Sequence, residues 1–229
     1  MPPGRSGRLT ETGMDSFVFP KWTNALRPAL AVGVAGGLVY IVFVAAYGAS
    51  PKTTDVGYAP LQPVEYQHSM HGGELGMDCR YCHNTVERSA HAAIPPTQTC
   101  MNCHKLINVE STKLLVVRES YATGMPIEWV RVHDLPDYVY FDHSAHLRAG
   151  VGCVSCHGRV DKMDVVYQAE TLSMGWCLDC HRSPEQHLRP RESVARMDWM
   201  AMEDQGLLGR RLRELYDVNP KDDCSVCHR

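Results

Sequence analysis

The chain has 229 residues, 44% of them hydrophobic and 21% charged, with a formal net charge of −3. These values suit one or two ordinary globular domains, and without a basic run they exclude nucleic acid as an expected partner. The unusual number is ten cysteines.

Residues 29–49 are predicted to form one transmembrane helix. The stretch from Ala29 to Tyr47 carries no charge and is close to the roughly 20 residues that span a bilayer. Four basic residues precede the stretch, namely Arg5, Arg8, Lys21 and Arg27, and only Lys52 follows it closely. This asymmetry predicts a cytoplasmic tail over residues 1–28 and transfer of the remainder across the membrane.

A cleaved signal peptide ending near Gly48 is the alternative to a retained helix. The apolar run is longer than the roughly 7 to 15 residues of a typical signal core, which favours the anchor. Both interpretations place the cysteines outside the cytoplasm. The sequence leaves open whether the protein starts at Met1 or Met14.

Within the predicted helix, Gly33, Gly36 and Gly37 would allow close approach of a partner helix, although glycine is common in membrane helices generally. Residues 50–65 hold Pro51, Pro60 and Pro63 and are expected to form an extended linker. Residues 66–229 are then predicted to form one periplasmic domain.

An internal duplication organises this domain. Tyr66-Gln-His-Ser-Met-His71 resembles Phe141-Asp-His-Ser-Ala-His146, and each is followed at nearly equal spacing by two Cys-x-x-Cys-His motifs. The repeated units are residues 66–104 and 141–181. A fifth motif, at 224–228, stands alone near the C-terminus.

Three further elements are expected between and after these units. A capped helix is predicted from Glu110 to Gly124, with Ser111 as the cap. A small hairpin is predicted from 129–133 and 138–141. An amphipathic helix with leucines at 207, 208, 212 and 215 is expected within 191–223, before Pro220.

The five Cys-x-x-Cys-His motifs use every cysteine and predict five covalently bound haem c groups. The thioether-forming residues are Cys79, Cys82, Cys100, Cys103, Cys153, Cys156, Cys177, Cys180, Cys224 and Cys227. The proximal iron ligands are His83, His104, His157, His181 and His228. Zinc sites would combine two cysteine clusters, and disulfides would not require a histidine after every pair, so both alternatives are disfavoured.

Seven histidines remain as candidates for the other side of each iron. His68, His71, His143 and His146 resemble the distal ligands of small cytochromes of the c3 and c7 type. That resemblance implies that the first histidine of each pair serves the nearby haem and the second serves another. His91 and His133 are further predicted ligands, His187 is a weaker candidate, and the fourth haem could instead use Met163 or Met174.

The fold class expected from these features is a multihaem cytochrome c. About 180 residues outside the membrane are too few to bury five haems in a conventional core. The prediction is therefore short α-helices and irregular loops wrapped around the haems, with little β structure, plus one N-terminal transmembrane helix. Six-coordinate haems lack an open site for substrate, so the predicted role is electron relay.

Several segments resemble the pentahaem cytochrome c subunit of bacterial alternative complex III. They are Val56-Gly-Tyr-Ala-Pro-Leu-Gln-Pro63, Gly76-Met-Asp-Cys-Arg-Tyr-Cys-His83, Cys100-Met-Asn-Cys-His104 and Met174-Gly-Trp-Cys-Leu-Asp-Cys-His181. The resemblance implies a quinol-oxidising membrane complex containing an iron-sulfur subunit, multi-spanning quinol-binding subunits and a monohaem cytochrome c. This chain would carry electrons and would not be catalytic alone.

Two other functions stay open at this point. One is a self-sufficient, membrane-anchored multihaem quinol dehydrogenase, against which the five motifs and the duplication weigh. The other is a multihaem oxyanion reductase, which would need an open iron, whereas all five motifs here end in histidine.

Overall fold

The computed structural model describes residues 19–48, 50 and 54–228. The chain divides into an N-terminal part, Met1–Ser50, and a body, Pro51–Arg229. Most of the predicted tail over 1–28, including the alternative start at Met14, lies outside the described residues.

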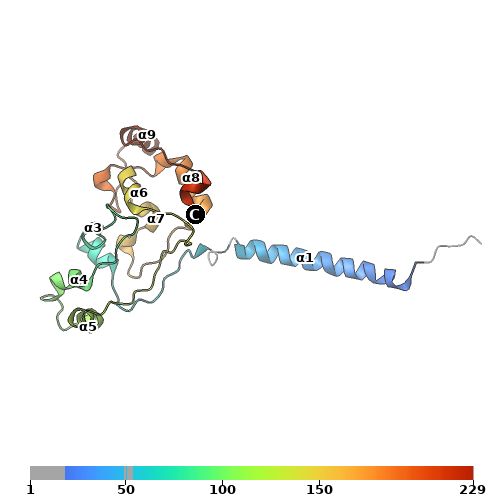
Figure 1. Cartoon of the computed structure of the whole chain (residues 1–229), viewed down its shortest axis with the longest axis horizontal. Helices are drawn as coiled ribbons and strands as arrows, with labels where there is room; N and C mark the ends of the chain where they lie inside the picture. Colours follow the sequence, from blue (N-terminus) through green and yellow to red (C-terminus); the bar gives the residue numbers. More distant parts are fainter. Residues whose placement is uncertain (1–18, 49, 51–53, 229) are drawn as a thin grey trace, which may run out of the picture. The chain divides into compact units, whose positions relative to one another are not determined.

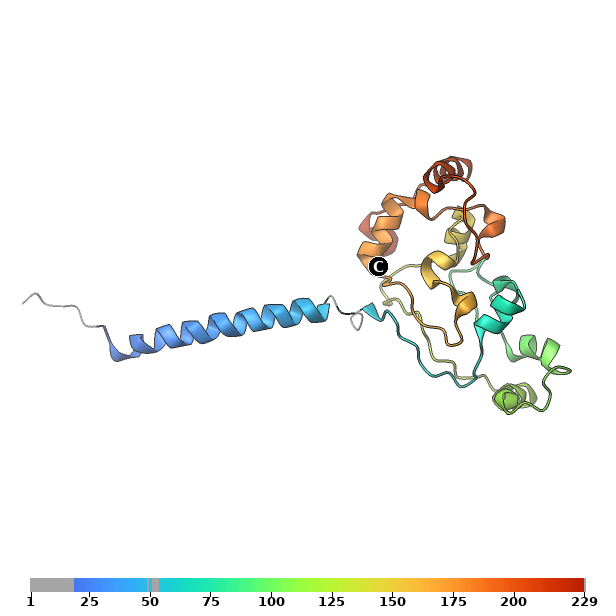
Figure 2. The same cartoon turned by 180° about the vertical axis from the view of Figure 1, so that it is seen from behind.

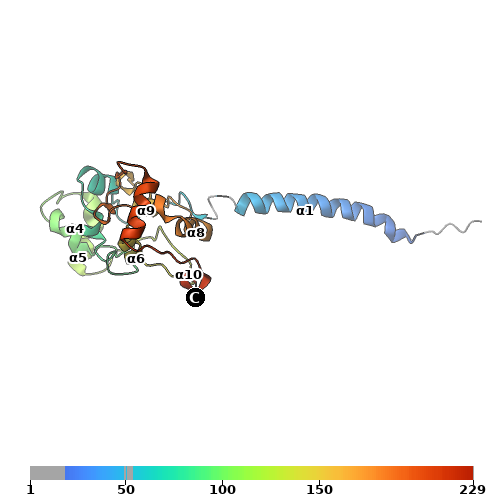
Figure 3. The ribbon, with the colours of Figure 1, turned by 90° about the horizontal axis from the view of Figure 1, so that it is seen from above.

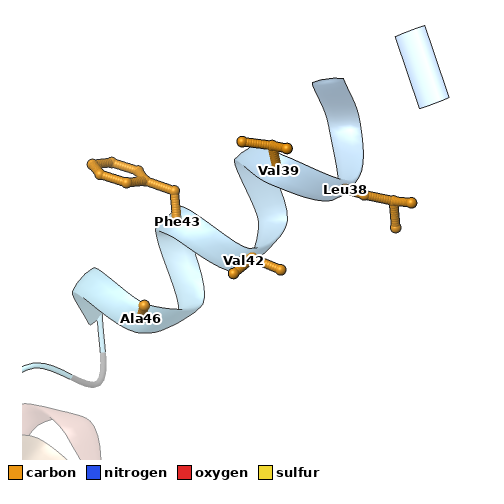
Figure 4. A pocket seen from close by; sticks show the side chains of 5 residues that line it. All are labelled: Leu38, Val39, Val42, Phe43 and Ala46. Atoms are coloured by element: carbon orange, nitrogen blue, oxygen red, sulfur yellow. The ribbon is translucent and has the colours of Figure 1, made fainter. Parts of the chain in front are cut away.

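The N-terminal part is one long helix. A 3₁₀ turn, η1 (Lys21–Ala25), leads into α1 (Leu26–Gly48), and together they are long and apolar enough to cross a membrane. The helix starts at Leu26, before the charge-free run. Pro28 is tolerated there because it lies in the first turn, where backbone N–H groups have no helical acceptor. Leu38, Val39, Val42, Phe43 and Ala46 line a shallow apolar hollow on it (Figure 4).

The body consists of short helices joined by irregular segments (Figure 1). Its helices are η2 (Ser69–Glu74), α3 (Cys79–Cys82), α4 (Thr97–His104), α5 (Leu115–Thr123), α6 (His143–Ala149), α7 (Val154–His157), α8 (Met174–Arg182), α9 (Gln205–Leu215) and α10 (Cys224–Cys227). Short 3₁₀ turns are η3 (Thr112–Leu114), η4 (Val160–Lys162), η5 (Pro184–Gln186) and η6 (Arg191–Ser193). The described residues contain no strand, only isolated bridges between Val139 and His228 and between Val151 and Leu188. The predicted fold class, mostly helical with little β structure, is confirmed.

The predicted hairpin is wrong, because each of its halves finds a more distant partner. Val130 donates its N–H to the Gln62 side chain at 2.9 Å and accepts from the same side chain at 2.8 Å. Val139 forms its bridge with His228, and the Tyr140 N–H donates to the Cys227 carbonyl at 2.8 Å.

Both predicted helices of the body are present. The first is shorter than expected and consists of η3 followed by α5, which ends at Gly124 with φ of +74°. Ser111 makes no side-chain capping bond. The second, α9, is capped by Asp204, which accepts from the Leu207 N–H at 2.8 Å.

The segment after the N-terminal part is fixed to the body by Gln168. Its side chain donates to the Thr54 carbonyl at 2.7 Å, and its main chain bonds Gly57 and Tyr58 at 2.8 and 3.1 Å. The predicted linker is thus hydrogen-bonded to the body from residue 54 onward.

Within the body, the helices carrying the cysteine motifs follow one another across the domain. Helices α4 and α5 lie at one end and α8 and α9 at the other, with α6 and α7 between them (Figures 1 and 2). Figure 3 shows α10 near the C-terminus on the side of α8. A small apolar cluster of Val64, Met101 and Val117 joins α4 to α5.

Candidate haem sites

Each Cys-x-x-Cys-His motif lies on a helical turn, which explains its spacing. In three motifs the histidine N–H donates to the carbonyl of the first cysteine, from His83 to Cys79, His157 to Cys153 and His228 to Cys224, at 2.8 to 3.0 Å. Residues three and four apart share one face of a helix. The turn therefore brings two thiols and one imidazole to the same side.

The ten thiols are free, with no disulfide among them. Burial is the main cause that raises the pKa of Cys153 to about 11 and of Cys156 to about 12. The described residues also contain no group of three or more His, Cys, Asp or Glu side chains placed to hold a metal ion directly.

Three proximal histidines each face a histidine of the repeated His-x-x-His segments. The ring centres are 6.3 Å apart for His71 and His104, 6.3 Å for His143 and His157, and 6.2 Å for His146 and His181. Metal–imidazole bonds of about 2 Å on opposite sides of one ion place the ring centres about 6 Å apart. The three separations match a metal ion between each pair.

His68 lies near His83 of the first motif. Burial, followed by repulsion from His83 and His71, lowers the pKa of His68 to about 4. Its Nδ1 atom is buried without a hydrogen-bond partner. In each unit the first histidine thus lies near the first motif and the second faces the second motif.

A backbone carbonyl holds the Nδ1 atom of six histidines. The acceptors are Gln67 for His71, Ala93 for His83, Ile107 for His104, Ala90 for His143, Asp142 for His146 and Lys221 for His181, at 2.6 to 3.1 Å. An imidazole that donates from Nδ1 keeps the Nε2 lone pair for a metal, and metal-bound histidines generally have such a partner. The donor set therefore fits haem iron.

The remaining predicted ligands have different surroundings. The ring centres of His133 and His157 are 4.5 Å apart, which is too close for a metal ion between the rings. The Nε2 atom of His133 is buried without a hydrogen-bond partner. His91 is exposed and His187 half-buried. The ring neighbour of His228 is Tyr138, at 5.8 Å.

The two methionine candidates for the fourth haem also differ. Met163 is buried beside Gly158, whereas Met174 is 64% exposed. Because His146 faces His181, a methionine ligand is not needed at that motif.

Sequence reasoning missed the role of the aromatic residue that begins each His-x-x-His segment. Tyr66 stacks on His71 with ring centres 4.4 Å apart, and Phe141 stacks on His146 at 4.7 Å. The repeated aromatic position was visible in the sequence as a landmark of the duplication, but its contact with the histidines was not.

Comparison with known proteins supports the haem interpretation. Residues 139–229 match the family described as cytochrome c7 and related cytochrome c. Over 148 residues the chain is 28% identical to the multihaem cytochrome c subunit of a menaquinone reductase from Nitratidesulfovibrio vulgaris, covering 56% of this chain and 70% of that protein. The match to the family begins at Val139, whose bridge to His228 connects the segment just before the second unit with the fifth motif. From residue 139 onward the chain is therefore similar to cytochrome c7 and related cytochrome c, and over a longer stretch it is similar to a multihaem cytochrome c subunit.

Proposed function

We propose that this chain carries five haem c groups and relays electrons between a quinone-reactive membrane complex and a periplasmic electron carrier. The observation that carries the proposal is the separation of 6.2 to 6.3 Å in three histidine pairs. A haem iron with imidazoles on both sides takes up and releases single electrons and has no position for a substrate. This favours relay over oxyanion reduction.

The proposed axial pairs follow the duplication. They are His68 with His83, His71 with His104, His143 with His157, and His146 with His181, and the fifth iron has His228 on its proximal side. Carbonyl bonds to Nδ1 hold most of these imidazoles in place. The chain thereby fixes ligand identity and orientation at four haems, which are main determinants of their potentials.

The cysteine neighbours support a linear path that differs from sequence order. After burial, the next cause that raises each thiol pKa is a thiol of another motif: Cys100 for Cys82, Cys79 for Cys153, Cys180 for Cys156, and Cys227 for Cys177. These neighbours order the motifs as second, first, third, fourth and fifth. The proposed path runs from α4 past α3, α7 and α8 to α10.

The proposed location is the bacterial cytoplasmic membrane, with α1 as a single-pass anchor, the N-terminus in the cytoplasm and the body in the periplasm. The apolar helix Lys21–Gly48 supports anchoring. The proposed partners are an iron-sulfur subunit, multi-spanning quinol-binding subunits and a monohaem cytochrome c, as in alternative complex III. The menaquinone reductase relative supports a role within a quinone-linked complex.

The direction of electron flow has two candidates. Quinol oxidation is the first, and quinone reduction is the second, because the relative is named a menaquinone reductase. In the purified complex, quinol would reduce the haems rapidly under the first proposal. Under the second proposal, a reduced electron carrier would donate electrons through the haems to quinone. The rate of that quinone reduction would exceed the rate at which quinol reduces the haems.

The decisive experiment is affinity purification of the full chain from native membranes. Intact-mass analysis is expected to show five haem additions, and protein identification is expected to find iron-sulfur and multi-spanning subunits. The isolated chain should show low-spin haems and no rapid reduction by quinol. Rapid reduction of the isolated chain would favour the self-sufficient dehydrogenase, and a large ligand-binding high-spin fraction would favour a reductase.

A further inference from the structure

One aromatic ring contacts both distal histidines in each unit. Tyr66 meets His68 edge-on, with ring centres 4.7 Å apart and planes at 83°, and stacks on His71 at 4.4 Å and 23°. Phe141 meets His143 at 4.8 Å and 87°, and stacks on His146 at 4.7 Å and 27°. The arrangement is the same in both units although the rest of their local structure differs.

These contacts restrict the rotation of each imidazole ring, in addition to the hydrogen bonds that some of the rings make. The χ2 torsion angle, which sets the plane of a histidine ring, has broad energy minima. Carbonyl bonds limit this rotation for His71, His143 and His146. The Nδ1 atom of His68 is buried without a partner, so the Tyr66 edge is a main contact that limits its plane.

We propose that Tyr66 and Phe141 are positioning residues, each of which sets the ring planes of the two distal histidines in its unit. The proposal rests on the proposed function, in which these histidines bind haem iron. Tyr66 would control the distal side of the first and second haems, and Phe141 that of the third and fourth. Neither aromatic side chain is a ligand.

The ring planes matter because the angle between two axial imidazoles shapes the electronic structure of a ferric haem. The structure has different angles at different pairs, 10° for His143 and His157, 62° for His71 and His104, and 49° for His146 and His181. Near-parallel rings give an ordinary rhombic electron paramagnetic resonance signal, and strongly tilted rings give a signal with a large maximal g value. The spectrum therefore reports the planes directly.

The matching position is Tyr66 in the first unit and Phe141 in the second. This difference allows the effect of the aromatic ring to be tested separately from the effect of the hydroxyl group. Burial, followed by the nearby thiols of Cys82, Cys100 and Cys79, raises the pKa of Tyr66. The Tyr66 hydroxyl thus lies near the first and second motifs. Tyr66→Phe removes this group and keeps the ring, whereas Phe141→Tyr adds it to the second unit.

The test uses the full haem-loaded chain in its complex, with electron paramagnetic resonance and a redox titration of each variant. Tyr66→Leu is expected to shift the signals and potentials of two haems, and Phe141→Leu those of two others. Tyr66→Phe and Phe141→Tyr are expected to retain the wild-type g values. Unchanged spectra in both leucine variants at full haem content would overturn the proposal.

Two additional variants keep the result interpretable. If a leucine variant fails to assemble, Tyr66→Trp retains an aromatic face of another size and should shift the same two signals, and unchanged signals there also count against the proposal. His71→Ala tests the ligand assignment on its own. If His71→Ala creates no high-spin haem, the proposed function fails; if it does while the Tyr66 variants change nothing, only the positioning role fails.

Discussion

The two units hold the histidines of their His-x-x-His segments in the same way on different helices. In the first, η2 is a π-helix without a side-chain cap. In the second, α6 is an α-helix capped by Asp142 and ended by Gly150. Nevertheless, the second histidine of each unit donates from Nδ1 to the carbonyl four residues earlier, at 2.9 Å for His71 and 2.8 Å for His146.

The difference lies in what supports each helix. The first unit depends on a distant segment, because Ser69 donates its hydroxyl to Asp164 at 2.5 Å and its N–H to the Met163 carbonyl at 3.1 Å. The second unit has a local cap in addition to distant support, because the His143 N–H and Nδ1 donate to the Ala90 carbonyl at 3.2 and 2.7 Å. Histidine spacing and the aromatic contact are therefore common to both units. The type of helix, a π-helix in the first unit and a capped α-helix in the second, is not.

The largest expected effect comes from removing one distal histidine in each unit. His71→Ala and His146→Ala should each convert one haem from low spin to high spin, at the second and fourth motifs respectively, because each ring faces a proximal histidine. Electron paramagnetic resonance and carbon monoxide binding measure the change. His187→Ala removes a histidine outside the four proposed pairs and should leave the signals of the first four haems intact. Two haems affected by either variant would contradict the pairing.

A pair of glycines should distinguish the units by stability. Gly76 and Gly150 each lie three residues before a motif and have φ of +62° and +86°. A methyl group at Gly76 would meet nothing within 4 Å, whereas one at Gly150 would lie 2.6 Å from the Arg189 carbonyl oxygen. Gly76→Ala should cost about 1 kcal/mol from the backbone conformation alone.

Gly150→Ala should cost roughly 1 to 3 kcal/mol more than Gly76→Ala, because the backbone at Arg189 must move. Chemical denaturation of the haem-loaded chain in detergent, followed by circular dichroism, measures both variants. Equal losses would show that the close approach at Gly150 relaxes freely.

The local cap of the second unit is the next feature to remove. The Asp142 side chain accepts from the Ser144 N–H at 2.8 Å and the Ala145 N–H at 3.3 Å. Asp142→Ala should lower the free energy of unfolding by about 1 kcal/mol, as for other lost N-caps. Gln67 occupies the matching position without capping a helix, so Gln67→Ala is the control and should change stability by less than about 0.5 kcal/mol.

The distant support of the first unit should have a smaller effect. Asp164 is exposed, so Asp164→Ala should cost less than about 1 kcal/mol. Its effect on haem spectra should appear at the second motif, served by His71, and not at the fourth. A change confined to the fourth haem would show that η2 is not held by this contact.

The smallest expected effect is the pH dependence of the Asp142 cap. The hydrogen bonds from Ser144 lower the pKa of Asp142. Its contribution is therefore complete above the unfolded value of about 3.9 and is lost as the pH falls through the lower folded value. The stability gap between wild type and Asp142→Ala should be constant from neutral pH to about pH 5 and should narrow below about pH 4. A gap that widens in acid would contradict this sign.

The sequence predicted the features that depend on local pattern. The helices ending at Gly124 and spanning the leucines of α9 follow from a glycine stop and helical periodicity, and the fold class follows from the repeated motifs. The ligand assignments remain predictions. The histidine pairing and the order of the motifs depend on contacts between distant segments, which no local pattern encodes.

The hairpin failed for the same physical reason. Residues 138–141 have strand-forming side chains, but a strand is stable only with a partner. The partner of Val139 proved to be His228, far along the chain. A short β-rich run predicts that a segment will be extended and does not predict what pairs with it.

The bridge between Val139 and His228 also bears on how the protein matures. Residues 221–228 bond to both ends of the second unit: Cys227 accepts from Tyr140, just before the unit, at 2.8 Å, and Lys221 accepts from His181 at 2.6 Å. These hydrogen bonds form only once the C-terminal segment is in place. A product ending before Lys221 would retain four motifs but leave the His181 Nδ1 atom without this carbonyl partner.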